Sequence, residues 1–196
     1  QSRGLGDVYK RQLIIFLLSF LAWLSSRSPK LSIGTAISFF VIGYFGMWKD
    51  TMSTMAIISV ATLICLIIGT PIGVLMARSE RLKNILSPVL DMMQTIPTFV
   101  YLIPIIMLLG IGKVPGLLAV CVYAIPPIVR LTNLGIREVD RRVVEAAKAL
   151  GIKKRIILFK IEIPLALPSI MTGVNQTIMM ALAMVVIASM IGVSGL

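Results

Sequence analysis

The chain has 196 residues, of which 58% are hydrophobic and 14% charged, and its formal net charge at pH 7 is +11. A soluble domain carries about 25% charged residues, so this composition excludes an ordinary soluble protein and indicates an integral membrane protein. The positive charge lies in loops between apolar runs, which favours the positive-inside pattern of membrane proteins over nucleic-acid binding. There is no histidine, and both cysteines lie in apolar stretches, so a disulfide framework and a metal site are not expected.

Uncharged stretches of the sequence mark the expected membrane spans. A span needs about 20 apolar residues, with a range of roughly 17–25. All uncharged windows from residue 31 onward are expected to cross, with the short window 114–129 extended past Arg130 if that side chain reaches the interface. The first of them should end at Trp48, an interfacial anchor, before an outer turn at residues 49–50. The uncharged windows are 12–26, 31–48, 51–77, 92–112, 114–129 and 163–196.

The positions of lysine and arginine set the expected orientation. With Arg27 and Lys30 placed in the cytoplasm, alternation of the spans puts every later lysine and arginine on the same side except Lys49 and Lys113. Such a bias is typical of multi-pass membrane proteins and supports five spans from residue 31 onward. The charged segment 130–162 is therefore expected to lie in the cytoplasm.

The two ends of the chain depart from this pattern. Residues 1–12 differ in composition from the rest of the chain, and their basic residues would fall outside, so we expect a non-native or disordered tail there. The alternative is a native cytoplasmic tail, with residues 13–25 not crossing the membrane. The small residues at 189–196 are typical of an outer turn, with no returning helix after it. We therefore expect a chain truncated at both ends, with N-terminal transmembrane helices in residues 13–50.

Glycine and proline predict how the spans pack and bend. Gly69 and Gly73 form a small-xxx-small pair, which favours close helix packing, although a lipid-facing helix with incidental glycines is the alternative. Pro71, between them, is expected to kink the helix. Pro126-Pro127 is expected to break the span that contains it, near its inner end.

Polar side chains inside the spans are candidates for a solute path. Polar groups in a bilayer are costly and normally face protein or water. Gln94 and Thr95 are therefore expected to face protein or a water-filled path, and Asn175-Gln176-Thr177 is expected to be buried. Aromatic rings beside them could bind a cationic solute through their faces, although packing is the more common role of such rings. The candidate path residues are Gln94, Thr95, Phe99, Tyr101, Asn175 and Gln176.

The charged segment predicts two short helices joined by a glycine. Asp140 suits the N-cap of the first helix, and Gly151 suits its C-terminal stop. A second short helix is expected over residues 153–163, ending at Pro164. Composition alone favours an amphipathic helix on the lipid headgroups over a protruding elbow. The apolar face of the first helix is expected to hold Val139, Val143, Ala147 and Leu150.

The same segment carries a spaced pattern. Glu145-Ala146-Ala147 is followed after three residues by Gly151, and after nine more by Ile161-Glu162-Ile163-Pro164. This arrangement resembles the EAA loop of ABC-importer permeases, in which EAA, three residues, G, nine residues and I-x-L-P succeed one another. The sequence departs from that pattern at Ile163, where leucine is usual, a change within the same apolar class.

Further stretches resemble the glycine betaine/proline betaine permeases, namely residues 91–104, 173–177 and 184–192. The resemblance implies an all-α, polytopic membrane helical bundle with the type I ABC importer permease fold. It makes residues 51–196 the permease transmembrane domain, with an incomplete C-terminus and a cytoplasmic coupling loop at 137–164. The implied substrates are quaternary ammonium osmolytes such as glycine betaine and proline betaine, with choline and carnitine as further candidates.

The resemblance also implies partners. These are a separate ABC ATPase subunit, an extracytoplasmic substrate-binding protein and a second permease copy in a homodimer, in the cytoplasmic (inner) membrane of a bacterium or archaeon. In the family the loop glutamate contacts the ATPase and the glycine allows the turn, roles that pass to Glu145 and Gly151, with Ala146 and Ala147 allowing close helix approach. The chain contains no G-x-x-x-x-G-K-[ST] motif, so ATP and Mg²⁺ are expected in the partner. The chain itself is expected to be no enzyme and to hold no cofactor.

Other functions stay open at this point. One is a permease of the same fold for another small solute, such as an amino acid. A second is an ATP-independent carrier or channel whose basic loop holds anionic lipid. A third is a membrane-bound enzyme, which no histidine or carboxylate constellation supports, since Asp91 is the only acidic residue near a span edge without an obvious basic neighbour.

Overall fold

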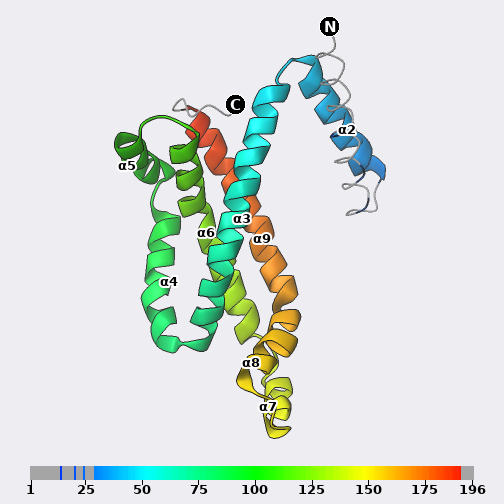
Figure 1. The fold of residues 1–196 in the computed structure, drawn as a ribbon, viewed down its shortest axis with the longest axis vertical. Helices are drawn as coiled ribbons and strands as arrows, with labels where there is room; N and C mark the ends of the chain where they lie inside the picture. The colour runs from blue at the N-terminus through cyan, green and yellow to red at the C-terminus, as the bar shows by residue number, and fades with distance from the viewer. Residues whose placement is uncertain (1–13, 15–19, 21–23, 25–28, 191–196) are drawn as a thin grey trace. The chain divides into compact units, whose positions relative to one another are not determined.

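The computed structural model describes residues 29–190 and the single residues Ile14, Phe20 and Leu24. The expected tail at residues 1–12 lies outside the described residues, as do residues 191–196 of the expected outer turn. Within the described part, the regular elements are all helices (Figure 1). The chain divides into two units, residues 1–52 and 53–196.

The first unit contains α2, Pro29–Tyr44, and the start of α3, Trp48–Arg78. The turn between them precedes Trp48, so the expected outer turn at residues 49–50 is wrong. The cause is Gly46, whose φ of 74° is a left-handed conformation that ends a helix, and the Met47 N–H donates back to the Ile42 carbonyl at 3.2 Å. Trp48 instead begins α3, and its ring meets Phe39 edge-on with centroids 6.3 Å apart.

The second unit is built on three long helices: the remainder of α3, then α6, Lys113–Arg137, and α9, Ile163–Met190 (Figure 1). Glycines let these helices touch. A Cβ on Gly73 would lie 2.6 Å from Thr132 Cβ in α6, and one on Gly135 would lie 2.6 Å from Ser169 Cβ in α9. The close packing predicted for the Gly69/Gly73 pair is thus confirmed, because both glycines lie against α6.

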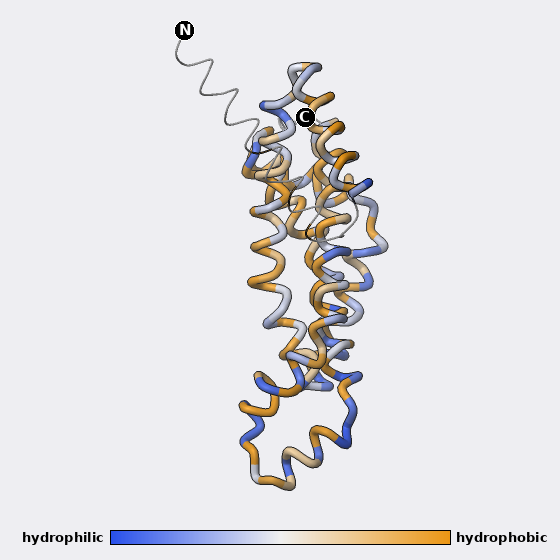
Figure 2. Tube along the Cα trace, turned by 90° about the vertical axis from the view of Figure 1, so that its right-hand side faces the viewer, coloured by the Kyte–Doolittle hydropathy of each residue, from blue (hydrophilic) through white to orange (hydrophobic). Residues whose placement is uncertain are grey.

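Three described helices are long and apolar enough to cross a membrane: Trp48–Arg78, Lys113–Arg137 and the continuous run Lys154–Met190. A fourth span is possible by length and composition if α4, Glu80–Thr95, and α5, Thr98–Leu109, count together. Figure 2 shows apolar residues along the long helices and a mixture at the lower end, which carries α7 and α8.

The expectation of a single helix over residues 92–112 is wrong. The chain bends by 90° between α4 and α5. The break lies at Pro97, which disfavours the helical conformation at the residue before it, and Ile96 is extended, with φ −70° and ψ 131°. In the other direction α4 reaches back to Glu80, where the Ser79 hydroxyl caps it by accepting the Leu82 N–H.

Two other expectations about proline are wrong. Pro126 and Pro127 are buried inside α6, and that helix runs on to Arg137 without a break. In a membrane helix, neighbouring elements can compensate for a lost backbone hydrogen bond. The helix after residue 153 also continues through Pro164: α8, Lys154–Ile157, leads through a π-helical turn, η1, Leu158–Glu162, into α9. The wide turn lies directly before this proline, where an ordinary helix would lose a bond.

Candidate functional site

The charged segment forms an elbow, which we define as residues 140–162. Its first helix is α7, Arg141–Ala149. The Asp140 carboxylate caps it by accepting the Arg142 N–H at 2.9 Å, as predicted. At the other end Gly151 has φ 74°, the predicted left-handed stop. Its N–H donates to the Lys148 carbonyl at 2.9 Å, and the next N–H, of Ile152, donates to the Ala147 carbonyl at 3.2 Å. These two bonds close the helix end and turn the chain toward α8.

The four predicted coupling residues lie in this elbow with different exposures. Glu145, Ala146 and Gly151 are exposed, whereas Ala147 is buried against the chain itself. Ala147 therefore anchors α7 within the protein, while Glu145 and Ala146 are free to meet a partner.

The predicted apolar face of α7 is only half covered. Val139 and Ala147 are buried, but Val143 is 41% exposed and Leu150 is 80% exposed. Apolar side chains that are exposed in the single chain are typical of a surface that contacts another molecule.

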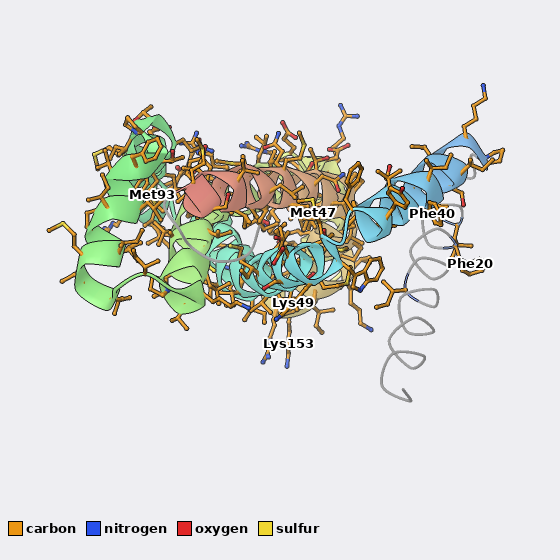
Figure 3. All side chains as sticks on the ribbon, turned by 90° about the horizontal axis from the view of Figure 1, so that it is seen from above. Phe20, Phe40, Met47, Lys49, Met93 and Lys153 are labelled. Atoms are coloured by element: carbon orange, nitrogen blue, oxygen red, sulfur yellow. The ribbon has the colours of Figure 1, made fainter. Side chains whose placement is uncertain are left out.

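An ion pair ties the elbow to α3. The Arg78 guanidinium lies 2.8 Å from the Glu162 carboxylate and also donates to the Lys154 carbonyl at 3.3 Å. Together with Lys148 and Ile157, these residues line a small cavity of about 240 Å³. Lys153, beside this cavity, points away from the helices (Figure 3). Sequence reasoning missed the pair, although a lone acid directly before the last uncharged window was a signal for it.

A second, larger cavity of about 430 Å³ lies between α3, α4, α6 and α9. It brings together two predicted path residues, Gln94 of α4 and Gln176 of α9, although they are far apart in sequence. The other polar residues that line it are Ser87, Arg130 and Asn133. Two predicted path residues from helices far apart in sequence therefore line the same cavity.

The remaining predicted path residues lie elsewhere. The Thr95 hydroxyl donates to the Asp91 carbonyl at 3.0 Å, and the Tyr101 hydroxyl donates to the Met93 carbonyl at 2.9 Å. The Tyr101 bond joins α5 to the end of α4 and so holds the bend, whereas the Thr95 bond lies within α4. Phe99 is 45% exposed and does not line the cavity.

Asn175, Gln176 and Thr177 of α9 are all expected to be buried, but only one of the three is. Thr177 is fully buried, but Asn175 and Gln176 are exposed in the single chain. Residues two apart on a helix point in different directions, which is why Thr177 can be covered by the bundle while its neighbours are not.

Asp91 has a basic partner that sequence reasoning missed. It forms an ion pair with Arg130 of α6, 39 residues away. Arg130 also has a buried Nε atom without a hydrogen-bond partner. No local pattern could have found this pair, because it depends on how α4 packs against α6.

Comparison with known proteins identifies the family of the chain. Residues 69–196 match the family described as "Binding-protein-dependent transport system inner membrane component". The chain is 51% identical over 182 residues to the glycine betaine/proline betaine transport system permease protein ProW of Salmonella typhimurium, covering 93% of this chain and 51% of ProW. It is 41% identical over 193 residues to the glycine betaine transport system permease protein OpuAB of Bacillus subtilis, covering 98% of this chain and 68% of OpuAB.

The fold has a counterpart among solved structures. A chain of the MetNI methionine ABC transporter, in an inward-facing conformation, matches with a TM-score of 0.69 and 23% identity, over 76% of this chain and 77% of that one. The chain spans about half the length of ProW. It is an all-α, multi-pass membrane protein with the type I importer permease fold, and it belongs to the family of binding-protein-dependent transport system inner membrane components.

Proposed function

We propose that the protein is the permease subunit of an ATP-driven ABC importer for glycine betaine, proline betaine or a related quaternary ammonium osmolyte. The observation that carries the proposal is the 51% identity, over 93% of the chain, to a permease whose name states that substrate pair. In this proposal ATP and Mg²⁺ are bound by a separate ATPase subunit. The chain forms the path and performs no chemistry.

The elbow is the proposed docking point for the ATPase. Glu145 and Ala146 are exposed on α7, and a small residue beside a carboxylate allows close approach and orients the contact. The elbow is stiff because the Asp140 cap, the Gly151 stop and the Arg78–Glu162 ion pair fix it at three points. A partner that moves α7 would therefore move the elbow as a unit.

The helix Lys154–Met190 is the proposed route from the elbow to the path. It is continuous through η1, so that displacement at the elbow passes along one rod. The same helix carries Gln176, which lines the larger cavity with Gln94 of α4. We include these two residues in the proposed path, whereas Tyr101 is assigned to holding the bend and the Thr95 hydroxyl bonds within α4.

Uncovered polar residues of the single chain point to further partners. Asn175 and Gln176 are exposed on a membrane-spanning helix, where polar groups need protein or water around them. A second permease copy, as in a homodimer, would supply that cover. The proposal also includes an extracytoplasmic binding protein and location in the inner membrane of a bacterium or archaeon.

The test uses the full-length protein with its ATPase and binding protein, reconstituted in vesicles that enclose ATP. The expected result is ATP-dependent accumulation of labelled glycine betaine. Glu145→Ala should lower the uptake rate by about tenfold or more, because losing a hydrogen bond to a charged group costs about 1.5–3 kcal/mol.

The matched control is Glu138→Ala, which removes an exposed carboxylate just before α7 and should leave uptake unchanged. Uptake that proceeds without the ATPase would contradict the importer assignment. Uptake of another solute that excess glycine betaine fails to inhibit would contradict the substrate assignment.

A further inference from the structure

The cavity of about 430 Å³ has a lining suited to an oxyanion. Its size falls within the range of about 300–1,000 Å³ that is typical of small-molecule sites. Among the described residues that line it, Arg130 is the only charged one. Amide side chains reach it from three helices: Gln94 from α4, Asn133 from α6 and Gln176 from α9.

Arg130 has unused hydrogen-bonding capacity. A guanidinium carries five N–H donors. One terminal nitrogen pairs with Asp91, but the Nε atom is buried and has no partner. Because the buried Nε has almost no accessible surface, the donors that remain for a ligand are those of the terminal nitrogens. A carboxylate fits, because its two oxygens match the guanidinium fork.

The amide of Asn133 is already oriented. Its carbonyl oxygen accepts the Arg137 Nε–H at 3.0 Å, so its NH₂ group is left to donate. Donors rather than acceptors are what a carboxylate needs, since its oxygens only accept. The Asn133 amide and the Arg130 guanidinium, both in the lining, therefore offer donors to whatever occupies the cavity.

Asp91 narrows the class of ligand. Its carboxylate is not part of the lining, but it pairs with the Arg130 guanidinium that is, so a simple anion such as phosphate would come close to a negative charge next to the positive one. A zwitterion meets no such conflict, because its cationic group can turn toward Asp91. The adjacent positive and negative charges of Arg130 and Asp91 thus complement the negative carboxylate and the cationic group of a zwitterionic solute.

We propose that this cavity binds a small zwitterionic solute whose carboxylate is held by Arg130, with Asn133 donating a further hydrogen bond and the nearby Asp91, just outside the lining, attracting the cationic group. The inference rests on the proposed transport function and adds the residue that recognises the acid group. It separates glycine betaine from choline, which has the same trimethylammonium group but no carboxylate.

The experiment measures protection of a thiol inside the cavity. Ser87 lines the cavity without being one of the proposed ligands, and the native Cys65 and Cys121 are buried and free. The Ser87→Cys variant of the full-length complex, in phosphatidylcholine nanodiscs without the binding protein, is labelled with a small thiol reagent. Glycine betaine should slow the labelling, and choline at equal concentration should not.

The Arg130→Gln change is then added to Ser87→Cys. It should raise the concentration of glycine betaine needed for half protection by about tenfold or more, the scale expected for losing a hydrogen bond to a charged group. The control is Arg81→Gln, which removes the same charge at an exposed position of α4 and should keep protection. If Arg130→Gln prevents folding, the Ser87→Cys variant alone still tests the inference, through the difference in protection between glycine betaine and choline.

Three outcomes would overturn the inference: equal protection by choline, protection that survives Arg130→Gln, or slow labelling caused only by adding anionic phosphatidylglycerol. Uptake by the unmodified transporter is measured separately. If it imports another zwitterion, the glycine betaine assignment fails, and the labelling is repeated with that zwitterion. Protection that then depends on Arg130 supports the inference on its own.

Discussion

The glycines of the long-helix bundle and the glycine of the elbow serve opposite needs. Gly73 and Gly135 have ordinary helical backbones but no room, since an added Cβ would lie 2.6 Å from a side-chain carbon of the facing helix. Gly151 has open space around it but a φ of 74°, which other residues rarely adopt. In the bundle, glycine therefore sets the distance between helices, whereas in the elbow it sets the direction of the chain.

The largest expected effect comes from filling the space at Gly73. Gly73→Leu should destabilise the protein by about 1–3 kcal/mol or more, because neither Thr132 Cβ nor the Val129 carbonyl, 2.7 Å away, can move without shifting α6. The measurement is the thermal unfolding temperature of the purified complex, followed by size-exclusion chromatography after heating.

Gly34→Leu is the matched control for that change. It makes the same substitution in α2, where nothing lies within 4 Å of the added Cβ, and should leave the unfolding temperature unchanged. A Gly73→Leu protein as stable as the original would show that α3 does not pack on α6 in the way described.

A smaller effect is expected at Gly151. Gly151→Ala should destabilise the elbow by about 1–2 kcal/mol through the left-handed backbone alone. Amide hydrogen exchange in α7 should speed up while exchange in α6 stays the same. Gly151→Asn should cost less, because asparagine tolerates this conformation better than alanine does. Equal exchange rates for the alanine and asparagine variants would contradict the role given to φ.

Removing the cap at the other end of α7 should destabilise the elbow by a similar or slightly smaller amount. Asp140→Ala should cost about 1 kcal/mol, because the Arg142 N–H loses its acceptor. Exchange should accelerate in the first turn of α7 more than in its last. Asp140→Asn keeps an acceptor oxygen and should restore most of the protection, which a purely electrostatic role for the carboxylate would not allow.

The smallest effect belongs to the ion pair between the bundle and the elbow. The Arg78 side chain is 35% exposed, so its pairing with Glu162 should contribute about 0–1 kcal/mol. A double-mutant cycle of Arg78→Gln and Glu162→Gln on thermal stability isolates that term. A coupling energy well above this range would mean that the elbow and α3 are more firmly joined than the exposure suggests.

Local chemistry in the sequence predicted the first helix of the elbow well. Asp140 and Gly151 gave the ends of α7, because capping depends on residues within one turn of the helix end. The packing of Gly69 and Gly73 was also predictable, since a four-residue spacing places small residues on one face.

Features that depend on packing were not predictable. Pro97 breaks a helix, while Pro126 and Pro127 lie inside one, although only Pro126-Pro127 was expected to break its span. At the break, the Met93 carbonyl loses its helical donor because Pro97 has no N–H, and the Tyr101 hydroxyl reaches it only because α5 folds back. The pair of Asp91 and Arg130 joins residues on different helices, so it too became visible only in three dimensions.

The π-helical turn at η1 has a consequence for rotation. A π-helical turn amounts to one inserted residue, and one residue of an α-helix corresponds to about 100° around its axis. If η1 relaxed to ordinary α-helix, the whole of α9 would turn by about that angle relative to the elbow. Leu158–Glu162 thus fixes the angular phase between the surface of α7 and the face of α9 that carries Gln176.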